Sequence, residues 1–94
     1  MRDELKASLG PSHFSDLRAH IARDAVIVVD ASLDLLDVGE AIARDEAARV
    51  DAWVKSGLVK KPSLEMLERW SHLEGSAFTS LVVQPFVLVR EGVD

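Results

Sequence analysis

The amino-acid sequence predicts an α+β domain: a winged-helix-like helical core with a small antiparallel β-sheet. Size is one reason, because 94 residues of which 48% are hydrophobic suffice for one core but not for two. Periodicity is another, since stretches with apolar residues at helical spacing alternate with short β-branched runs. The third is order. From the second helix onward, the expected succession helix, strand, helix, helix, strand, helix, strand matches a winged helix-turn-helix domain with an extra helix inserted in its wing.

The chain is expected to form a single domain over residues 1–94. In this domain a helical arm, residues 1–11, precedes a core over residues 12–90. Gly10 and Pro11 end the arm's helix, because glycine suits the position past a helix end and proline cannot continue the helix. Ser15 and Ser32 are expected to be the N-caps of the next two helices. The helices are predicted over residues 2–9, 15–23 and 33–44, with a short buried strand, AVIVV, over residues 25–29.

The second half is expected to hold two more helices and the longest strand. A core helix over residues 46–56, with Ala47, Val50 and Val54 on its inward face, ends at Gly57. A short strand follows in LVKK, and then a helix over residues 64–73 that begins after an N-cap at Ser63. Pro85 interrupts the strand segment FTSLVVQPFVLVR. Because proline cannot donate to a sheet ladder, that segment is an edge strand, is bulged, or is two strands at an angle.

Composition excludes several classes of protein. The chain has no cysteine, which excludes disulfides and thiolate metal sites and favours a reducing, cytoplasmic compartment. Its N-terminus is charged and lacks the apolar core of a secretory signal, and its longest purely apolar run, AVIVV, is far too short to span a membrane. The net charge of −5 generally repels phosphate backbones unless the basic residues cluster.

One segment, residues 44–61, carries a net positive charge. In a winged-helix protein it would supply the recognition helix and part of the wing, which contact DNA. Asp45, Glu46 and Asp51 lie among its bases and would oppose phosphate contact, so DNA binding is the alternative hypothesis. The residues that it requires are Arg44, Arg49, Lys55, Lys60 and Lys61.

No arrangement typical of catalysis or metal binding is found in the sequence, and we expect no enzyme activity, no metal and no cofactor. His13, His20 and His72 lack the three- or four-residue spacing that places two imidazoles on one metal ion. Asp30 and Asp34, with Asp37, could share a divalent cation, but acids at a helix start more often complement the helix dipole.

The C-terminal strand is the most informative candidate surface. A long apolar strand at a sheet edge exposes backbone groups that invite pairing with another chain. We therefore expect a protein-interaction or self-associating module, either a symmetric homodimer or a complex with another protein. Trp53 and Trp70 could anchor a partner, but their helical spacing favours the core. The predicted interaction edge consists of Gln84, Pro85, Phe86, Val87 and Val89.

Three segments together resemble the bacterial family called domain of unknown function 2288. They are RDAVIVVDASLDLLDVGEAIARD, VDAWVKSGLVKKPS and LVVQPFVLVR. The combination of Leu33-Asp34-Leu35 with Gln84-Pro85-Phe86 is the most specific part of the resemblance. It implies a small cytoplasmic bacterial protein and implies no activity, so it assigns no functional residues.

Overall fold

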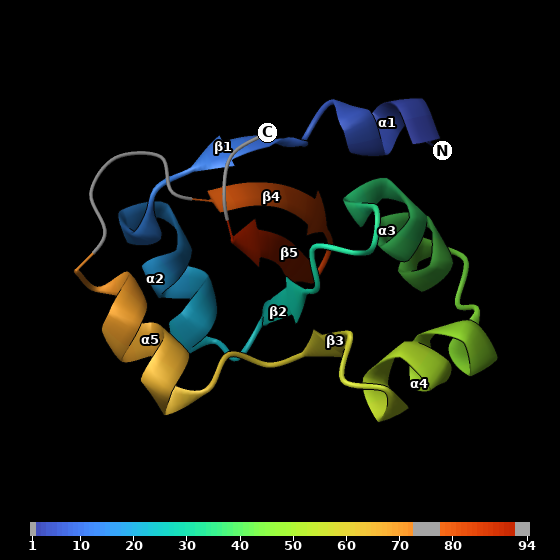
Figure 1. Ribbon diagram of the computed structural model, residues 1–94. Coiled ribbons are helices and arrows are strands. Elements are labelled where there is room, and N and C mark those ends of the chain that lie inside the picture. The colour runs from blue at the N-terminus through green and yellow to red at the C-terminus, as the bar shows by residue number, and fades with distance from the viewer. Residues whose placement is uncertain (1, 73–77, 92–94) are drawn as a thin grey trace.

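The computed structural model describes residues 2–72 and 78–91, which form five helices and five strands (Figure 1). None of the helices in these residues has both the length and the apolar composition needed to span a lipid bilayer. In chain order the elements are α1 (Arg2–Lys6), β1 (Gly10–Ser12), α2 (Phe14–Ala22), β2 (Val26–Val29), α3 (Leu35–Ala43), α4 (Ala47–Lys55), β3 (Val59–Lys60), α5 (Leu64–Trp70), β4 (Phe78–Val83) and β5 (Phe86–Glu91).

The strands form one mixed sheet in the order β1-β4-β5-β2-β3. β4 and β5 are antiparallel neighbours, but β5 runs parallel to β2, with Val26 opposite Val87 and Val28 opposite Val89. The expectation of an antiparallel sheet is therefore wrong, and the mixed α+β fold is confirmed. The winged-helix details are not confirmed, because β3 pairs with β2 and lies three strands away from β4, so these two strands do not form the expected wing.

Helices cover both faces of the sheet, because successive side chains along its inner strands alternate between two apolar clusters. Val26 and Val28 point toward α2 and α5, and Ile27 and Val29 point toward α3. In Figure 1, α2 and α5 lie on one side of the sheet, and α3 and α4 lie on the other. We call these the α2/α5 side and the α3/α4 side.

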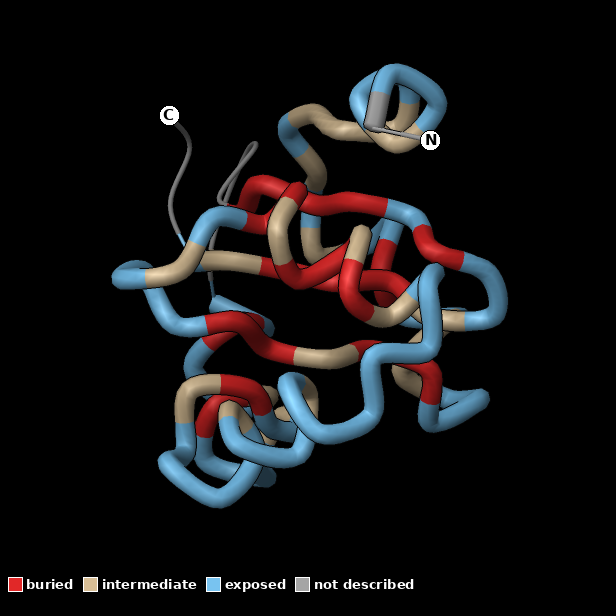
Figure 2. Tube along the Cα trace, turned by 90° about the vertical axis from the view of Figure 1, so that its right-hand side faces the viewer, coloured by how far each residue is buried: buried red, intermediate tan, exposed pale blue. Residues whose placement is uncertain are grey.

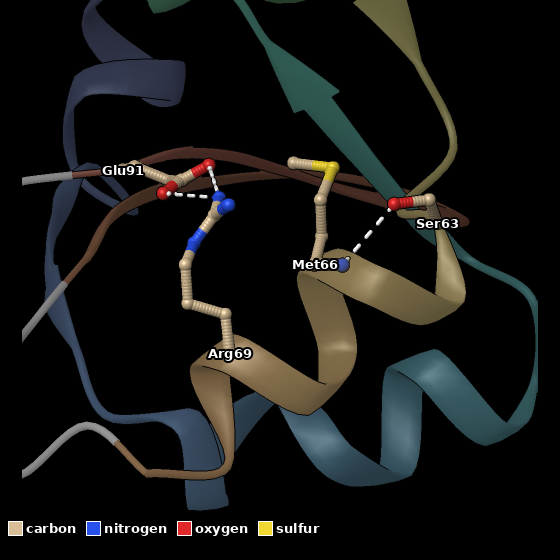
Figure 3. A network of polar contacts seen from close by, with 4 residues as sticks. All are labelled: Ser63, Met66, Arg69 and Glu91. Carbon is tan, nitrogen blue, oxygen red and sulfur yellow. Dashed lines mark hydrogen bonds and ion pairs between the residues drawn. The ribbon is translucent and has the colours of Figure 1, made fainter.

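Large buried side chains form the core on the α2/α5 side. Trp70 is 0% exposed, and its ring and that of Phe78 form a T-shaped pair with a centroid distance of 4.9 Å and an interplanar angle of 72°. Leu17 from α2 completes this cluster. Arg69 of α5 also reaches the end of β5, where its guanidinium Nη2 donates to the two carboxylate oxygens of Glu91 at 2.8 and 2.9 Å (Figure 3). The helix is thus attached to the sheet by both apolar and charged contacts.

On the α3/α4 side, α3 buries the most residues against the sheet, and Leu5 of α1 and Trp53 of α4 pack at its margin. Leu35, Leu36 and Val38 of α3 are buried. Gly39 lies against β4 so tightly that an added Cβ would stand 2.6 Å from Leu81 Cδ2 and 3.2 Å from Val83 Cγ2. The small residue therefore sets how near α3 approaches the sheet.

The same four residues, Ile-Ala-Arg-Asp, end both α2 and α3. Asp24 and Asp45 each adopt a left-handed conformation, with φ of 58°. The next residue donates its N–H five residues back in each case: Ala25 to the His20 carbonyl and Glu46 to the Ala41 carbonyl, both at 2.9 Å. This is the Schellman helix end, which glycine usually forms and which aspartate tolerates.

Several predicted boundaries need correction. The N-cap of α2 is His13 rather than Ser15, and the Asp16 carboxylate accepts from the His13 N–H at 3.0 Å. The N-cap of α3 is Asp34 rather than Ser32. Ser63 is confirmed as the N-cap of α5, since its hydroxyl accepts from the Met66 N–H at 3.1 Å (Figure 3).

The N-terminal arm and the C-terminal strand segment also differ from expectation. The arm's helix is shorter than predicted, and residues 10–12 form β1, whereas Gly10 and Pro11 were expected only to end a helix. The segment around Pro85 forms two strands, as the third expected form had it, but they pair with each other as an antiparallel hairpin, which was not predicted. They turn at a cis Gln84–Pro85 peptide bond. The helix predicted over residues 64–73 is α5, which ends at Trp70. Residue 73, the last of the predicted helix, lies outside the described part of the chain.

Candidate functional site: an apolar groove beside α4

Helix α4 is the least buried of the helices that flank the sheet. None of its residues is buried, and its trace is exposed or intermediate throughout in Figure 2. The prediction that Ala47, Val50 and Val54 face the core is wrong for Ala47, which is exposed, and for Val54, which is 51% exposed, and Val50 is only partly buried. Trp53 of α4 is partly buried and packs against the core cluster of the α3/α4 side, so its expected place in the core is met only in part.

A groove of about 660 Å³ lies between α4, the end of α3 and the sheet. We call it the α4 groove. Ile27 of β2 and Phe86 of β5 contribute from the sheet, and Ile42 contributes from the end of α3. Val50 and Val54 contribute from α4 itself. These side chains are all partly or largely exposed, so an apolar surface lies open to solvent.

The charged residues that line the α4 groove are acidic. They are Asp45, Glu46 and Asp51, and no basic side chain belongs to the described lining. Arg49 Nη1 lies 3.8 Å from Glu46 Oε2, and Lys55 Nζ lies 2.9 Å from Asp51 Oδ2. The groove is therefore lined by apolar side chains and by three carboxylates, of which Glu46 and Asp51 have a basic neighbour and Asp45 has no ion pair among the described residues.

The composition of α4 is a signal in the sequence that could have indicated this groove, although we predicted a core helix here. Of the nine residues of α4, three are alanine and three are charged, which leaves little apolar surface for burial. α3, of equal length, carries five buried residues. A helix with so few large apolar residues cannot fill the space above a sheet, and a gap beside it follows.

The predicted interaction edge is not an edge. β5 lies between β4 and β2, so its backbone groups face a strand on each side. Val87 and Val89 are buried in the core at 3% and 0% exposure. Gln84 and Pro85 are exposed in the turn, and only Phe86 reaches the α4 groove. The error arose because a proline-interrupted run of apolar residues can be a single edge strand or a hairpin of inner strands.

The five basic residues of the DNA hypothesis each have an acidic neighbour. Arg44 Nη2 lies 3.2 Å from Glu40 Oε1. Arg49 pairs with Glu46, Lys55 pairs with Asp51, and Lys61 pairs with Asp24. Lys60 lies near enough to Asp30 to lower its pKa. Arg49 also lies over the ring of Trp53, 4.9 Å from its centroid. The structure therefore does not bring these bases together as an unopposed positive patch.

The predicted acids serve local structure. Ser32 donates its hydroxyl and its N–H to the Asp30 carboxylate at 2.6 and 2.9 Å, and these bonds hold the pKa of Asp30 below its ordinary value. Asp34 accepts from the Leu36 N–H at 2.8 Å as the helix cap. Within residues 2–72 and 78–91, no three histidine or acidic side chains converge as a metal site would require.

A second, smaller cleft of about 250 Å³ lies where β2 and β5 end. Its charged residues have both signs: Lys60 and Arg90 face Asp30 and Glu91. Glu91 is bound by Arg69, and Asp30 is bound by Ser32. The cleft thus presents no excess of one charge that would select a ligand.

Comparison with known proteins gives a family and one solved structure. The solution NMR structure of PA1075 from Pseudomonas aeruginosa is similar, with a TM-score of 0.83 and 29% sequence identity over 96% of this chain and 82% of that one. No protein with a curated description matches. The model of the family described as "Protein of unknown function (DUF2288)" matches residues 1–91. Because that match covers nearly the whole chain, the protein belongs to this family.

Proposed function

We propose that the protein is a non-enzymatic, cytoplasmic interaction module that holds another protein in the α4 groove. One observation carries this proposal: five large apolar side chains from two strands and two helices line an open groove, whereas Trp70 and Phe78 on the opposite side of the sheet are fully buried. Exposed apolar patches of this kind on small proteins commonly mark binding sites.

Self-association through a sheet edge has less support than binding of a different protein. The two outer strands are β1 and β3, and both are short. β1 contains Pro11, and β3 ends in Lys60 just before Lys61 and Pro62. Proline, lysine and short length are the features that discourage strand pairing between molecules. Two copies that met groove to groove would also bring acidic walls together.

Two matched variants test the proposal. Val54→Glu places a charge in the α4 groove, and Leu64→Glu places the same charge on α5 at a side chain that is 86% exposed and outside the groove. Immobilised wild type and both variants are incubated with an extract of the source organism. Each retained protein is then purified and its affinity is measured by calorimetry.

We expect at least one partner that binds wild type and Leu64→Glu and loses more than about tenfold in affinity with Val54→Glu, because a buried charge is costly. If no purified protein distinguishes the two variants, the groove is not the binding surface. Sedimentation equilibrium of the same samples measures self-association. A mass of two chains that Val54→Glu reduces to one would make the second copy the occupant instead.

The alternative, a winged-helix DNA regulator, draws support only from the order β2, α3, α4, β3. The acidic neighbours of all five candidate bases argue against it. Anisotropy of a labelled random DNA duplex tests it at about 50 and 200 mM salt, because binding through phosphates weakens steeply as salt rises. Micromolar binding that Lys60→Ala and Lys61→Ala weaken would revive this alternative.

A further inference from the structure

We infer that the occupant of the α4 groove is an amphipathic helix that carries at least one lysine or arginine beside its apolar face. This inference rests on the proposed function, which it deepens by naming the chemical class of the partner. Three features of the groove lead to it: the strands that contribute to it, the charge on its wall, and the small residues of α4.

An occupant of the groove must satisfy its own backbone hydrogen bonds. Ile27 and Phe86 belong to β2 and β5, which are inner strands in the order of the sheet, although β3 pairs with β2 only at Val28 and Val29. Their side chains contribute to the groove from the face of the sheet that α3 covers, so a peptide in the groove lies over that face rather than alongside a strand as an additional strand. Buried backbone groups without partners are costly. A helix pairs its own backbone groups and presents apolar side chains to a groove, which is a recurrent mode of recognition.

The carboxylates that line the groove favour an occupant that carries a positive charge. Asp45, Glu46 and Asp51 line the groove together with no base. Glu46 and Asp51 already have Arg49 and Lys55 nearby, but no ion pair to Asp45 is found among the described residues. A lysine or arginine on the incoming helix would complement this carboxylate, which is exposed at the start of the wall.

Small residues on α4 allow a second helix to come close. Ala47 and Ala48 belong to the lining of the groove. Alanine adds little bulk between two helix axes, so large side chains of the incoming helix can reach Ile27, Ile42 and Phe86. We therefore expect apolar residues on the partner at a spacing of three and four.

The test is a selection from a phage-displayed library of random 16-residue peptides. The library is selected on wild type after depletion on Val54→Glu, which removes peptides that bind elsewhere. We expect enriched peptides with apolar residues at positions i, i+3 or i+4, and i+7, with Lys or Arg in excess over Asp and Glu, and without internal proline.

The outcomes separate this inference from the proposed function. If depletion on Val54→Glu leaves no enriched peptide, the groove does not bind polypeptide, and the proposed function fails together with the inference. If peptides are enriched but are proline-rich, acidic or without helical spacing, the groove binds protein and only the inference is overturned.

A pair of aspartates tests the charge requirement. Asn adopts the left-handed conformation as readily as Asp, so Asp45→Asn removes the charge and keeps the helix end. Asp24→Asn is the matched control, because Asp24 ends α2 in the same way and lies outside the groove. We expect Asp45→Asn to weaken binding of an enriched peptide about two- to fivefold at low salt. Equal affinities for wild type, Asp45→Asn and Asp24→Asn would overturn the charge requirement.

Discussion

The two sides of the sheet differ in how completely helices cover them. On the α2/α5 side, α5 buries Met66 and Trp70, and an ion pair joins its Arg69 to Glu91 at the end of β5. On the α3/α4 side, α3 is tightly packed but α4 buries no residue and leaves the α4 groove. Both sides thus contribute buried side chains to the core, but the surface available to a partner lies on the α3/α4 side, beside α4.

Both sides use the same helix end, Ile-Ala-Arg-Asp, and diverge immediately after it. After Asp24 the chain continues into Ala25 and β2, whose residues are buried except for the partly buried Ile27. After Asp45 it continues into Glu46 and α4, whose residues are not buried. The same four residues therefore end a helix in both places, whereas the packing of the element that follows depends on which apolar side chains that element contributes.

The largest expected change in the free energy of unfolding is for a buried residue of the α2/α5 side. We expect Trp70→Ala to lower the free energy of unfolding by about 3–5 kcal/mol, because it leaves a cavity against Phe78. Val54→Ala, on the half-exposed face of α4, should change it by less than about 0.5 kcal/mol. Urea unfolding followed by circular dichroism measures both. Similar losses for the two variants would show that α4 carries as much stability as α5.

The next largest effect tests whether α3, unlike α4, is held closely against the sheet. Gly39→Val is expected to lower the free energy of unfolding by about 1–3 kcal/mol, because the new side chain would collide with Leu81 and Val83. Gly10→Val is the control, since no atom lies within 4 Å of the Cβ position there. Urea unfolding of both variants checks this, and a neutral Gly39→Val would mean that α3 can also move away from the sheet.

A smaller effect compares one ion pair from each side. The Arg69–Glu91 pair joins a helix to the sheet, and the Lys55–Asp51 pair joins two turns of α4. Both are largely exposed, so a double-mutant cycle with glutamine at 69 and 91 should give a coupling of about 0.2–1 kcal/mol. A cycle with glutamine at 55 and asparagine at 51 should give about 0.3–0.5 kcal/mol. Both couplings should fall as salt increases. A coupling that salt leaves unchanged would contradict this description of exposed pairs.

The smallest effect is the titration of Asp30, where β2 ends. Ser32→Ala removes the hydroxyl donor, so we expect the pKa of Asp30 to rise toward its ordinary value. A carboxylate whose pKa is lowered by folding stabilises the fold above its ordinary pKa and loses that contribution as pH falls through the folded value. Ser32→Ala should therefore be less stable than wild type near neutral pH, and the difference should vanish in acid.

Carbon-13 NMR of the Asp30 carboxyl checks this titration. Ser56→Ala is the control, because the Ser56 hydroxyl donates to the Ala52 carbonyl and not to a carboxylate. An Asp30 titration that is the same in wild type and Ser32→Ala would show that the hydroxyl is not the main cause of the lowered pKa.

The sequence by itself determined most local structure. Apolar spacing located α2 to α5, the β-branched run 26–29 located β2, and Ser63 was identified as a helix cap. These features depend on neighbours a few residues apart, which a single sequence displays. The family resemblance is confirmed as well, because its residues extend over most of the chain.

Only the tertiary structure decided which strands pair and which faces are covered. β5 pairs with β4 beside it in the chain but also with β2, about sixty residues earlier, and that pairing turns a presumed edge into the centre of the sheet. Likewise, Val50 and Val54 of α4 have the spacing of core residues, but Ile27, Ile42 and Phe86 leave a groove beside them rather than a filled core. Spacing shows which side chains of one helix share a face. It cannot show whether distant elements supply enough volume to bury that face, because that depends on how the whole chain packs.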